Sequence, residues 1–285
     1  MALRPARDGD AADLAAALIA ALVAPEAQAP LPRTMVVGAH PDDETAFAGF
    51  RLTRLAAAQF VCITDGSPRD GADAARYGLT PAQYAQARAR ELQEVLGSCG
   101  IAAHRIRILG YTDQEAALHL AEIARRLTAA FQQHAIEAVL THPYEGGHPD
   151  HDATAFAVHA AARLLAQQGR RAPAIVEMAC YHEGREGLRA GAFLGVGAHD
   201  TVIHLSREEQ ARKRALLDRF ATQRHTLPYL PVAVECFRRA QDYDFLQPPH
   251  AGQLHYERQP WGMTGERFRA LARQALQELG LERAA

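Results

Sequence analysis

The sequence predicts an α/β fold: a Rossmann-like, doubly wound, mostly parallel sheet with helices on both faces. Short apolar runs alternate with longer segments of helical periodicity, which is the pattern of βαβ units. Most of the runs are apolar on both faces, as strands are in the middle of a parallel sheet that is covered on both sides. The expected strands are residues 34–38, 60–64, 106–109, 138–141 and 174–180.

Helices are expected between these strands. In "LTPAQYAQARARELQEVLG", Thr80 suits the N-cap, Pro81 suits the first turn and Gly97 suits the end of a helix. The expected helices are residues 45–58, 81–96, 115–134 and 152–168.

The regular alternation ends near residue 180. Residues 200–205 are expected to form a last strand, and Ser206 is expected to cap the helix that follows. Residues 226–265 are rich in proline, glycine and aromatic residues, and they predict a long, ordered loop. Residues 266–280 have the pattern of a terminal amphipathic helix.

The composition fits one globular domain. The chain has 285 residues, of which 48% are hydrophobic, and a formal net charge of -2, so its charge gives no case for binding nucleic acid. No repeat and no low-complexity linker divides it. We therefore expect a single domain over residues 1–285, with an N-terminal helical cap (1–32) and a C-terminal extension of loop and helix (226–285). The sequence predicts no interface, and the oligomeric state is left open.

The N-terminal segment and the cysteines predict a cytoplasmic protein without stable membrane insertion. The apolar run at residues 14–24 is too short to span a bilayer, and acidic residues precede it, unlike in a secretory leader. Cys62, Cys99, Cys180 and Cys236 form no CxxC pair. Cys62 and Cys180 lie in apolar runs and are expected to be buried thiols of a reducing compartment.

Unusual polar clusters follow four successive strands. They read "AHPDDE", "TDGSPRD", "GYTDQE" and "THPYEGGHPDHD". Ligands of open α/β sheets bind outside the carboxyl ends of the strands, and these clusters fall there. The sequence therefore predicts a functional site at this edge of the sheet.

The first and last clusters contain residues that suit a metal ion. His40 and Asp43 offer a nitrogen and an oxygen from one tight loop, and His148 and His151 form an H-x-x-H. Two imidazoles and one carboxylate form a three-ligand zinc site with an open position for water, as in hydrolytic zinc enzymes. Such a metal lowers the pKa of bound water towards neutrality. Nitrogen and oxygen ligands also accept other divalent transition metals, such as iron, cobalt or manganese.

The adjacent Asp42 and Asp43 point to two different roles. Consecutive side chains on an extended loop point in different directions, so one can bind the metal while the other acts as a general base on water. Glu44 begins the next helix, where a carboxylate also suits the positive end of the helix dipole.

In these residues the chain resembles the PIG-L (LmbE-like) family of zinc-dependent N-acetylglucosaminyl deacetylases. The resemblance extends over about residues 33–227. It rests on "AHPDDE" and "HPDH", in the expected order and after the expected strands, with lesser matches at "ITDG", "RAREL", "LGYTD" and "KRALLDRFATQ". The chain departs from the family in the approach to "HPDH" and in residues 228–285, so its substrate is the least determined property.

The resemblance implies a role for each matching residue. It implies that the zinc ligands are His40, Asp43 and His151. Asp42 would be the general base, and His148 would stabilise the oxyanion or protonate the leaving amine. Arg88 and Asp113 would contact the substrate. Tyr144, four residues before His148, is a further candidate for substrate contact, and a packed aromatic is the alternative.

The leading hypothesis is therefore a zinc-dependent N-deacetylase. It would remove an acetyl or other small acyl group from an amino sugar or related amine, and its partner would be a small N-acylated sugar or glycoconjugate. One alternative is a nucleotide-binding Rossmann-type enzyme, although the chain lacks the G-x-G-x-x-G fingerprint. The other is a non-catalytic sugar-binding module on the same fold.

Overall fold

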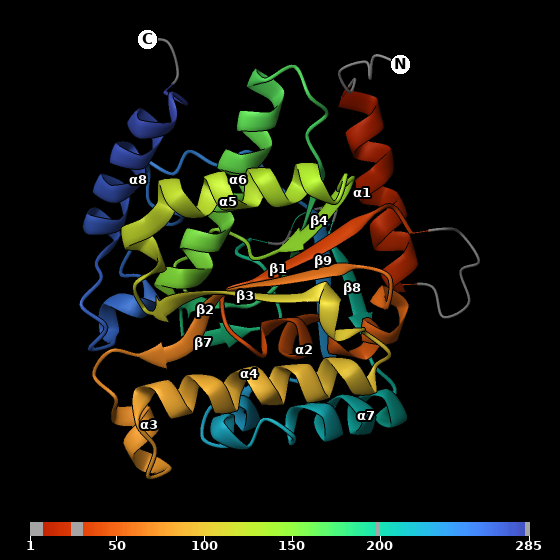
Figure 1. Ribbon diagram of the computed structural model, residues 1–285, viewed down its shortest axis with the longest axis vertical. Coiled ribbons are helices and arrows are strands. Elements are labelled where there is room, and N and C mark those ends of the chain that lie inside the picture. The colour runs from red at the N-terminus through yellow and green to blue at the C-terminus, as the bar shows by residue number, and fades with distance from the viewer. Residues whose placement is uncertain (1–7, 24–30, 196, 198–199, 283–285) are drawn as a thin grey trace.

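A seven-stranded sheet forms the centre of the molecule (Figure 1). The computed structural model describes residues 8–23, 31–195, 197 and 200–282. The strand order is β3-β2-β1-β4-β5-β9-β8; the first five of these strands are parallel, and β9 pairs antiparallel with both β5 and β8. The strands are β1 (Thr34–Gly38), β2 (Gln59–Pro68), β3 (Ile106–Asp113), β4 (Ala138–Thr141), β5 (Ala174–Met178), β8 (Thr201–His204) and β9 (Val234–Arg239). The predicted mostly parallel α/β sheet is confirmed.

Eight α-helices are described, together with six 3-10 turns (η1–η6) and a small hairpin. The helices are α1 (Asp8–Val23), α2 (Asp43–Ala48), α3 (Ala72–Arg76), α4 (Pro81–Ser98), α5 (Leu120–Gln133), α6 (Pro149–Gln167), α7 (Arg207–Leu217) and α8 (Gly265–Leu279). The hairpin pairs β6 (Tyr181–Gly184) with β7 (Gly187–Ala190). Residues 1–7 and 24–30 of the expected N-terminal cap, and 283–285 of the extension, lie outside the described residues.

The sheet has an apolar layer on each face. In β1, Met35 and Val37 pack with α5, α6 and α8, whereas Val36 packs with α1, α2 and α4 on the opposite side. Figure 1 shows α5 and α6 above the sheet and α4 and α7 below it. Every residue of β1 and β4 is buried, as expected of central parallel strands.

The predicted start of α4 is confirmed and its end is shifted. The Thr80 side chain accepts a hydrogen bond from the N–H of Gln83, the Gln83 side chain caps in return, and Pro81 opens the helix. The helix continues past Gly97 to Ser98, and Gly100 makes the turn with a φ of 83°. The Ser206 cap of α7 is confirmed in the same way, by a capping box with Glu209.

Two predicted helices are shorter than expected. The segment 45–58 forms α2 and then the 3-10 turn η1 (Gly49–Leu55). The break occurs because the N–H of Phe50 donates to Glu235 Oε1 at 3.1 Å instead of to a helix carbonyl. The segment 115–134 likewise begins as the 3-10 turn η3 (Ala116–His119) before α5.

The prediction of a continuous loop over 226–265 is wrong. Residues 234–239 form β9, an inner strand between β5 and β8. Its charged residues obscured the apolar pattern, because Glu235 and Arg238 are buried against charged partners: Lys213 Nζ lies 2.7 Å from Glu235 Oε1, and Arg238 Nε lies 2.7 Å from Glu177 Oε2. Among the described residues, no helix has both the length and the apolar character needed to cross a membrane.

Candidate metal centre

Two central strands bring the main polar clusters together. β1 and β4 are neighbours in the sheet, and β1 also pairs with β2 on its other side. The chain leaves β1 into the "AHPDDE" loop and leaves β4 into the loop that leads to "HPDH". Both loops emerge at the carboxyl edge, at the point where the strand order reverses, which is where open α/β sheets bind ligands.

The loop after β1 folds around the carboxylate of Asp43. Its Oδ2 accepts hydrogen bonds from the backbone N–H of Ala39 (2.9 Å) and of His40 (2.7 Å). Asp42 is the N-cap residue of α2 and Asp43 is the first helical residue. The two side chains diverge: Asp42 Oδ2 is 2.8 Å from Arg88 Nη2, whereas Asp43 Oδ1 is 3.3 Å from His151 Nε2.

The "HPDH" motif forms the beginning of α6. The helix starts at Pro149, earlier than the predicted start at residue 152, because Pro149 suits the first helical position. His148 is the N-cap residue, and its Nδ1 accepts a hydrogen bond from the N–H of Asp150 at 3.1 Å. His151 lies in the first turn. The two histidines are therefore one turn apart at a helix start, with ring centroids separated by 5.4 Å.

A tight approach fixes the loop that precedes this helix. A Cβ atom at Gly147 would lie only 1.9 Å from the carbonyl oxygen of Tyr181, so only glycine fits there. Asp152 accepts hydrogen bonds from the N–H groups of Glu145 and Gly146. The "YEGG" segment thus holds the helix start, and His148 with it, against β6.

Three groups among the described residues could hold a metal ion, and one of them is the ligand set that the sequence suggested. Ligand atoms of His40, Asp43 and His151 all lie within 4.8 Å of one another, and all three side chains are buried. Among the described residues, neither ring nitrogen of His151 has a hydrogen-bond partner, which is costly for a buried group unless a ligand satisfies it. Metal bonds of about 2.0–2.1 Å in a tetrahedron place ligand atoms roughly 3.3 Å apart. The 3.3 Å between His151 Nε2 and Asp43 Oδ1 matches that spacing.

A second buried cluster adjoins the first through His40. Its Nε2 lies 3.2 Å from Asp113 Oδ1 and 3.3 Å from Asp150 Oδ2. Asp150 also accepts hydrogen bonds from the N–H groups of Gln114 (2.6 Å) and Ala116 (3.0 Å). Gln114 has a φ of 72°, an unusual value for a residue other than glycine. Asp150 therefore ties the end of β3 to the start of α6.

The electrostatics of the site reflect an excess of buried carboxylates. Burial alone would lower the pKa of His40, but the neighbouring Asp113 carboxylate outweighs it and raises that pKa well above its usual value. Burial would raise the pKa of Asp43, yet His151 and His142 hold it well below its usual range. The carboxylates around His40 thus favour a positive charge at this position, and a divalent cation would supply such a charge.

The pKa values of Asp42 and His148 are shifted in opposite directions. Burial raises the pKa of Asp42, and the Arg88 guanidinium partly reverses this rise. Burial and the nearby His40 hold the pKa of His148 well below its usual value, so His148 is neutral near pH 7. Because its Nδ1 accepts the N–H of Asp150, the single ring proton of neutral His148 is on Nε2.

Arg88 enters the site from α4 and is almost fully buried. Its Nη1 donates to the carbonyl oxygen of Gly66 at 2.8 Å, its Nη2 donates to Asp42, and its Nη1 is 3.8 Å from Asp113 Oδ2. The guanidinium is thus held by protein groups. The guanidinium therefore lies beside Asp42, a contact that the sequence alone did not indicate.

The structure does not bring Tyr144 to this cluster. Its hydroxyl donates to the carbonyl of Gln247 at 3.0 Å, and its ring packs against Phe245 and Phe268 in the core. The other predicted site residues meet around one pocket of about 180 Å³, namely His40, Asp42, Asp43, Arg88, Asp113, His148 and His151.

Several pocket residues had no distinguishing pattern in the sequence. Tyr181, at the start of β6, lies 5.2 Å from His151 between ring centroids, and Trp261 from the C-terminal extension lies 4.4 Å from His148. Phe47, Leu227 and Leu230 add apolar surface to the same pocket. The tyrosine and the tryptophan come from distant parts of the chain, and the tertiary structure brings both to the pocket.

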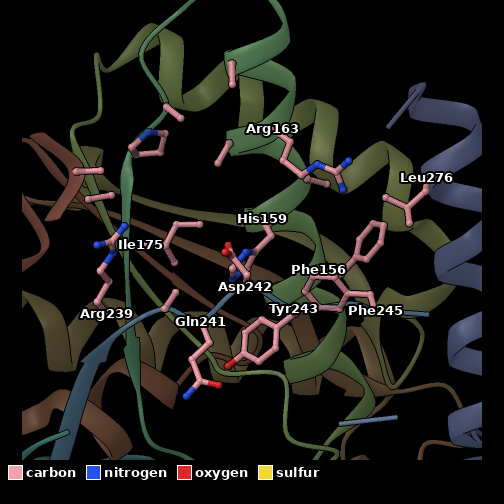
Figure 2. Close-up of a pocket in the computed structure, with 18 residues that line it drawn as sticks. Phe156, His159, Arg163, Ile175, Arg239, Gln241, Asp242, Tyr243, Phe245 and Leu276 are labelled. Atoms are coloured by element: carbon pink, nitrogen blue, oxygen red, sulfur yellow. The ribbon is translucent and has the colours of Figure 1, made fainter. Parts of the chain in front are cut away.

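A larger cavity lies elsewhere. It has a volume of about 560 Å³ and lies beside the start of β5 and the end of β9 (Figure 2). The candidate metal centre lies at the opposite edge of the sheet, where β1 and β4 end. Figure 2 shows His159 and Asp242 at its centre, with Phe156, Tyr243 and Phe245 beside them. Within the described residues, none of the groups able to hold a metal ion lies in this cavity.

Comparison with known proteins finds a family similarity over part of the chain. Residues 35–162 match the family model described as PIG-L: GlcNAc-PI de-N-acetylase. Over these residues, which contain both motifs, the chain is similar to that family. None of the curated proteins matches the chain.

Solved structures share the fold. The deacetylase of the A40926 pseudoaglycone, Dbv21, matches with a TM-score of 0.55 at 18% identity, covering 74% of this chain and 98% of that chain. The zinc-inhibited form of the teicoplanin deacetylase Orf2 matches with a TM-score of 0.52 at 14% identity, covering 74% of this chain and 100% of that chain. A deacetylase–teicoplanin complex matches with the same TM-score and coverage at 16% identity.

Proposed function

We propose that this protein is a metal-dependent N-deacetylase that uses zinc. Its substrate would be an amino sugar or related amine, from which it removes an N-acetyl or another small acyl group. The observation that carries the proposal is the buried group His40, Asp43 and His151, with unpartnered nitrogens on His151 and with Asp42 beside it. A PIG-L domain is where such a group is expected, and the deacetylases named above share the fold.

His40, Asp43 and His151 would hold the metal ion. When bound there, a zinc ion polarises the amide carbonyl and lowers the pKa of a water molecule. Every other group of the reaction would come from the chain. The alternative ligand set around Asp113 and Asp150 is less suitable, because the backbone N–H groups of Gln114 and Ala116 already occupy the oxygens of Asp150.

Asp42 would be the general base. Its carboxylate lies in the same pocket as the ligands, and the Arg88 guanidinium opposes the rise in its pKa that burial causes. It would accept a proton from the attacking water as the carbonyl carbon becomes tetrahedral. A base with a pKa raised by burial is better matched to neutral pH than an exposed aspartate.

His148 would donate a hydrogen bond to the oxyanion. Its ring proton is on Nε2, and at neutral pH its ring is uncharged. A neutral imidazole stabilises an oxyanion by its N–H, but giving up that proton would leave an imidazolate, which is unfavourable. We therefore assign the protonation of the leaving amine to Asp42, which has just received the proton of the water.

The substrate would lie across a two-sided pocket. Asp73, Gln114 and Gln223 give it polar groups that suit hydroxyls, and Trp261 offers a ring face beside His148. These features support an N-acylated sugar or glycoconjugate as the substrate. Dbv21 is named as a deacetylase of the A40926 pseudoaglycone and Orf2 as a teicoplanin deacetylase. The four buried, free cysteines support a reducing compartment such as the cytoplasm.

The test combines metal analysis with amine release. Purified protein should contain about one zinc per chain and should release amine from a panel of N-acetylated sugars, and a chelator should abolish that release. Asp42→Asn should keep the metal and lose activity. Asp70→Asn is the control: Asp70 is exposed and follows β2, and its replacement should keep both the metal and the activity. Full activity of Asp42→Asn with metal bound would refute the mechanism. Sugar binding that is insensitive to chelator, with no turnover, would favour the non-catalytic module.

A further inference from the structure

A buried histidine outside the predicted site contacts two of the proposed ligands. His142 follows β4 and is fully buried. Its Nε2 lies 3.0 Å from Asp43 Oδ2, and its ring stacks on that of His151 with centroids 4.1 Å apart and an interplanar angle of 6°. Its Nδ1 lies 3.0 Å from the Sγ of Cys180, which follows β5. The side chains of Asp43, His142 and Cys180, which follow the adjacent strands β1, β4 and β5, thus form one row beside the candidate metal centre.

The partners of His142 determine which nitrogen carries its proton. An ionised carboxylate only accepts hydrogen bonds, so the 3.0 Å contact with Asp43 is attractive only when Nε2 bears the hydrogen. The backbone N–H of Ala39 is also 3.0 Å from Nε2, but it is 2.9 Å from Asp43 Oδ2, so the carboxylate satisfies it. Nδ1 of the neutral ring is then an acceptor.

Cys180 supplies the donor that Nδ1 requires. Among the described residues, its thiol is the group recorded within hydrogen-bond distance of Nδ1. The other acceptor of this thiol, the carbonyl of Met178, is farther away at 3.4 Å. The two hydrogen bonds of this row therefore run in one direction: the Cys180 S–H donates to His142 Nδ1, and the His142 Nε2–H donates to Asp43 Oδ2.

We propose that His142 and Cys180 are positioning residues of the metal centre. Cys180 fixes the tautomer of His142, and His142 holds Oδ2 of Asp43 so that Oδ1 faces His151. This inference rests on the metal centre of the proposed function and adds residues that neither sequence motif contains. Groups that orient metal ligands in this way commonly change metal affinity by about 10- to 100-fold when they are replaced.

A matched pair of variants separates the hydrogen bond from the ring stacking. His142→Gln keeps an N–H donor near the position of Nε2 but loses the ring. His142→Phe keeps a ring against His151 but loses the donor. The measurement is the Zn²⁺ dissociation constant of the apo-protein, obtained by competition with a chromophoric chelator, with thermal unfolding of the apo-protein as the folding check.

A second pair tests the thiol. Cys180→Ala removes the donor, and Cys180→Ser keeps a hydroxyl donor. Cys236→Ala is the control, because Cys236 is also buried and free but belongs to β9 and lines no part of the pocket.

The expected order of zinc affinity is specific. His142→Phe should bind zinc about 10- to 100-fold more weakly than the wild type, and His142→Gln should bind more tightly than His142→Phe. Cys180→Ala should bind more weakly than Cys180→Ser, and Cys236→Ala should match the wild type. If the His142 variants do not fold, the two Cys180 variants decide the question by the same measurement.

The contrary outcomes are distinct. A folded His142→Phe with wild-type zinc affinity, or equal affinities of Cys180→Ala and Cys180→Ser, would overturn this inference and leave the metal centre intact. His142, His151 and Cys180 are also close enough to hold a cation themselves. A wild type that binds two zinc ions and a His142→Phe that binds one would make His142 a ligand and overturn the positioning role. A wild type that takes up no metal would overturn the proposed function itself.

Discussion

Replacing Arg88 by methionine tests whether this arginine controls the general base. Arg88 Nη2 lies 2.8 Å from Asp42 Oδ2, both side chains are buried, and burial already raises the pKa of Asp42. The glycine at position 66 leaves room for the guanidinium, because a Cβ atom there would lie only 2.5 Å from Arg88 Nη1. Methionine fills much of the same volume without a charge or a donor.

The size of the effect follows from the charge that is removed. A cation in direct contact lowers the pKa of a carboxyl group by about 1–3 units, which is about 1.4–4 kcal/mol. Without Arg88 the pKa of Asp42 rises by that amount. A protonated Asp42 cannot accept a proton, so the acid limb of the rate profile moves to higher pH by about 1–3 units. On that limb kcat/KM falls by about 10- to 1000-fold, and it recovers as the pH rises.

The assay is kcat/KM for amine release between pH 5 and pH 10. Arg90→Met is the matched control, since Arg90 lies on the same helix and is exposed. We expect it to leave the profile unchanged. A loss of rate in Arg88→Met that is equal at every pH, with an unmoved acid limb, would refute this reasoning. It would show instead that Arg88 acts by contacting the substrate, as the family resemblance implied.

Three further predictions concern stability. Burial raises the pKa of Glu44 from 4.5 to about 8, so the folded protein keeps a proton that the unfolded chain releases between these values. Its stability should fall by about 1.4 kcal/mol per pH unit across this window, and urea unfolding of Glu44→Gln should lack that fall. Lys213→Met leaves the buried Glu235 without its cationic partner, and it should lower the free energy of unfolding by about 3–5 kcal/mol in the same assay. The double variant Lys213→Met with Glu235→Leu should recover most of this loss, and no recovery would contradict the pairing. Removing metal with a chelator should lower the melting temperature, and zinc at 100 times its dissociation constant should restore about 2.7 kcal/mol; a melting temperature that is insensitive to both would argue against the site.

The sequence predicted the central strands and the edge that carries the site. β1 and β4 were recognisable because every position is apolar or small, and the polar residues that follow them are unlike ordinary turns. β9 was missed for the opposite reason. Glu235 and Arg238 look like exposed residues in one dimension, and only the fold brings Lys213 and Glu177 to neutralise them.

The same contrast applies to the site. Asp42, Asp43 and His151 belong to compact motifs whose spacing already indicates metal chemistry. His142 lies in the fourth polar cluster but outside its "HPDH" motif, and Cys180 follows an apolar run. The contacts that connect them to Asp43 cross three strand ends. Tyr144 shows the limit of proximity in sequence: it is four residues from His148, yet its side chain points into the core.

The pairing of β1 with β4 has a consequence for how the protein would acquire the proposed metal ion. Asp43 and His142 are 99 residues apart, and they meet because Met35 aligns with Val139 and Val36 with Leu140. Contacts so distant in the chain form late, since a long loop must close first. During synthesis His40 and Asp43 leave the ribosome long before His151, and alone they would form an incomplete chelate. If these residues hold an ion as proposed, its loading would wait until the middle of the sheet has assembled, and an occupied centre would mark completed folding.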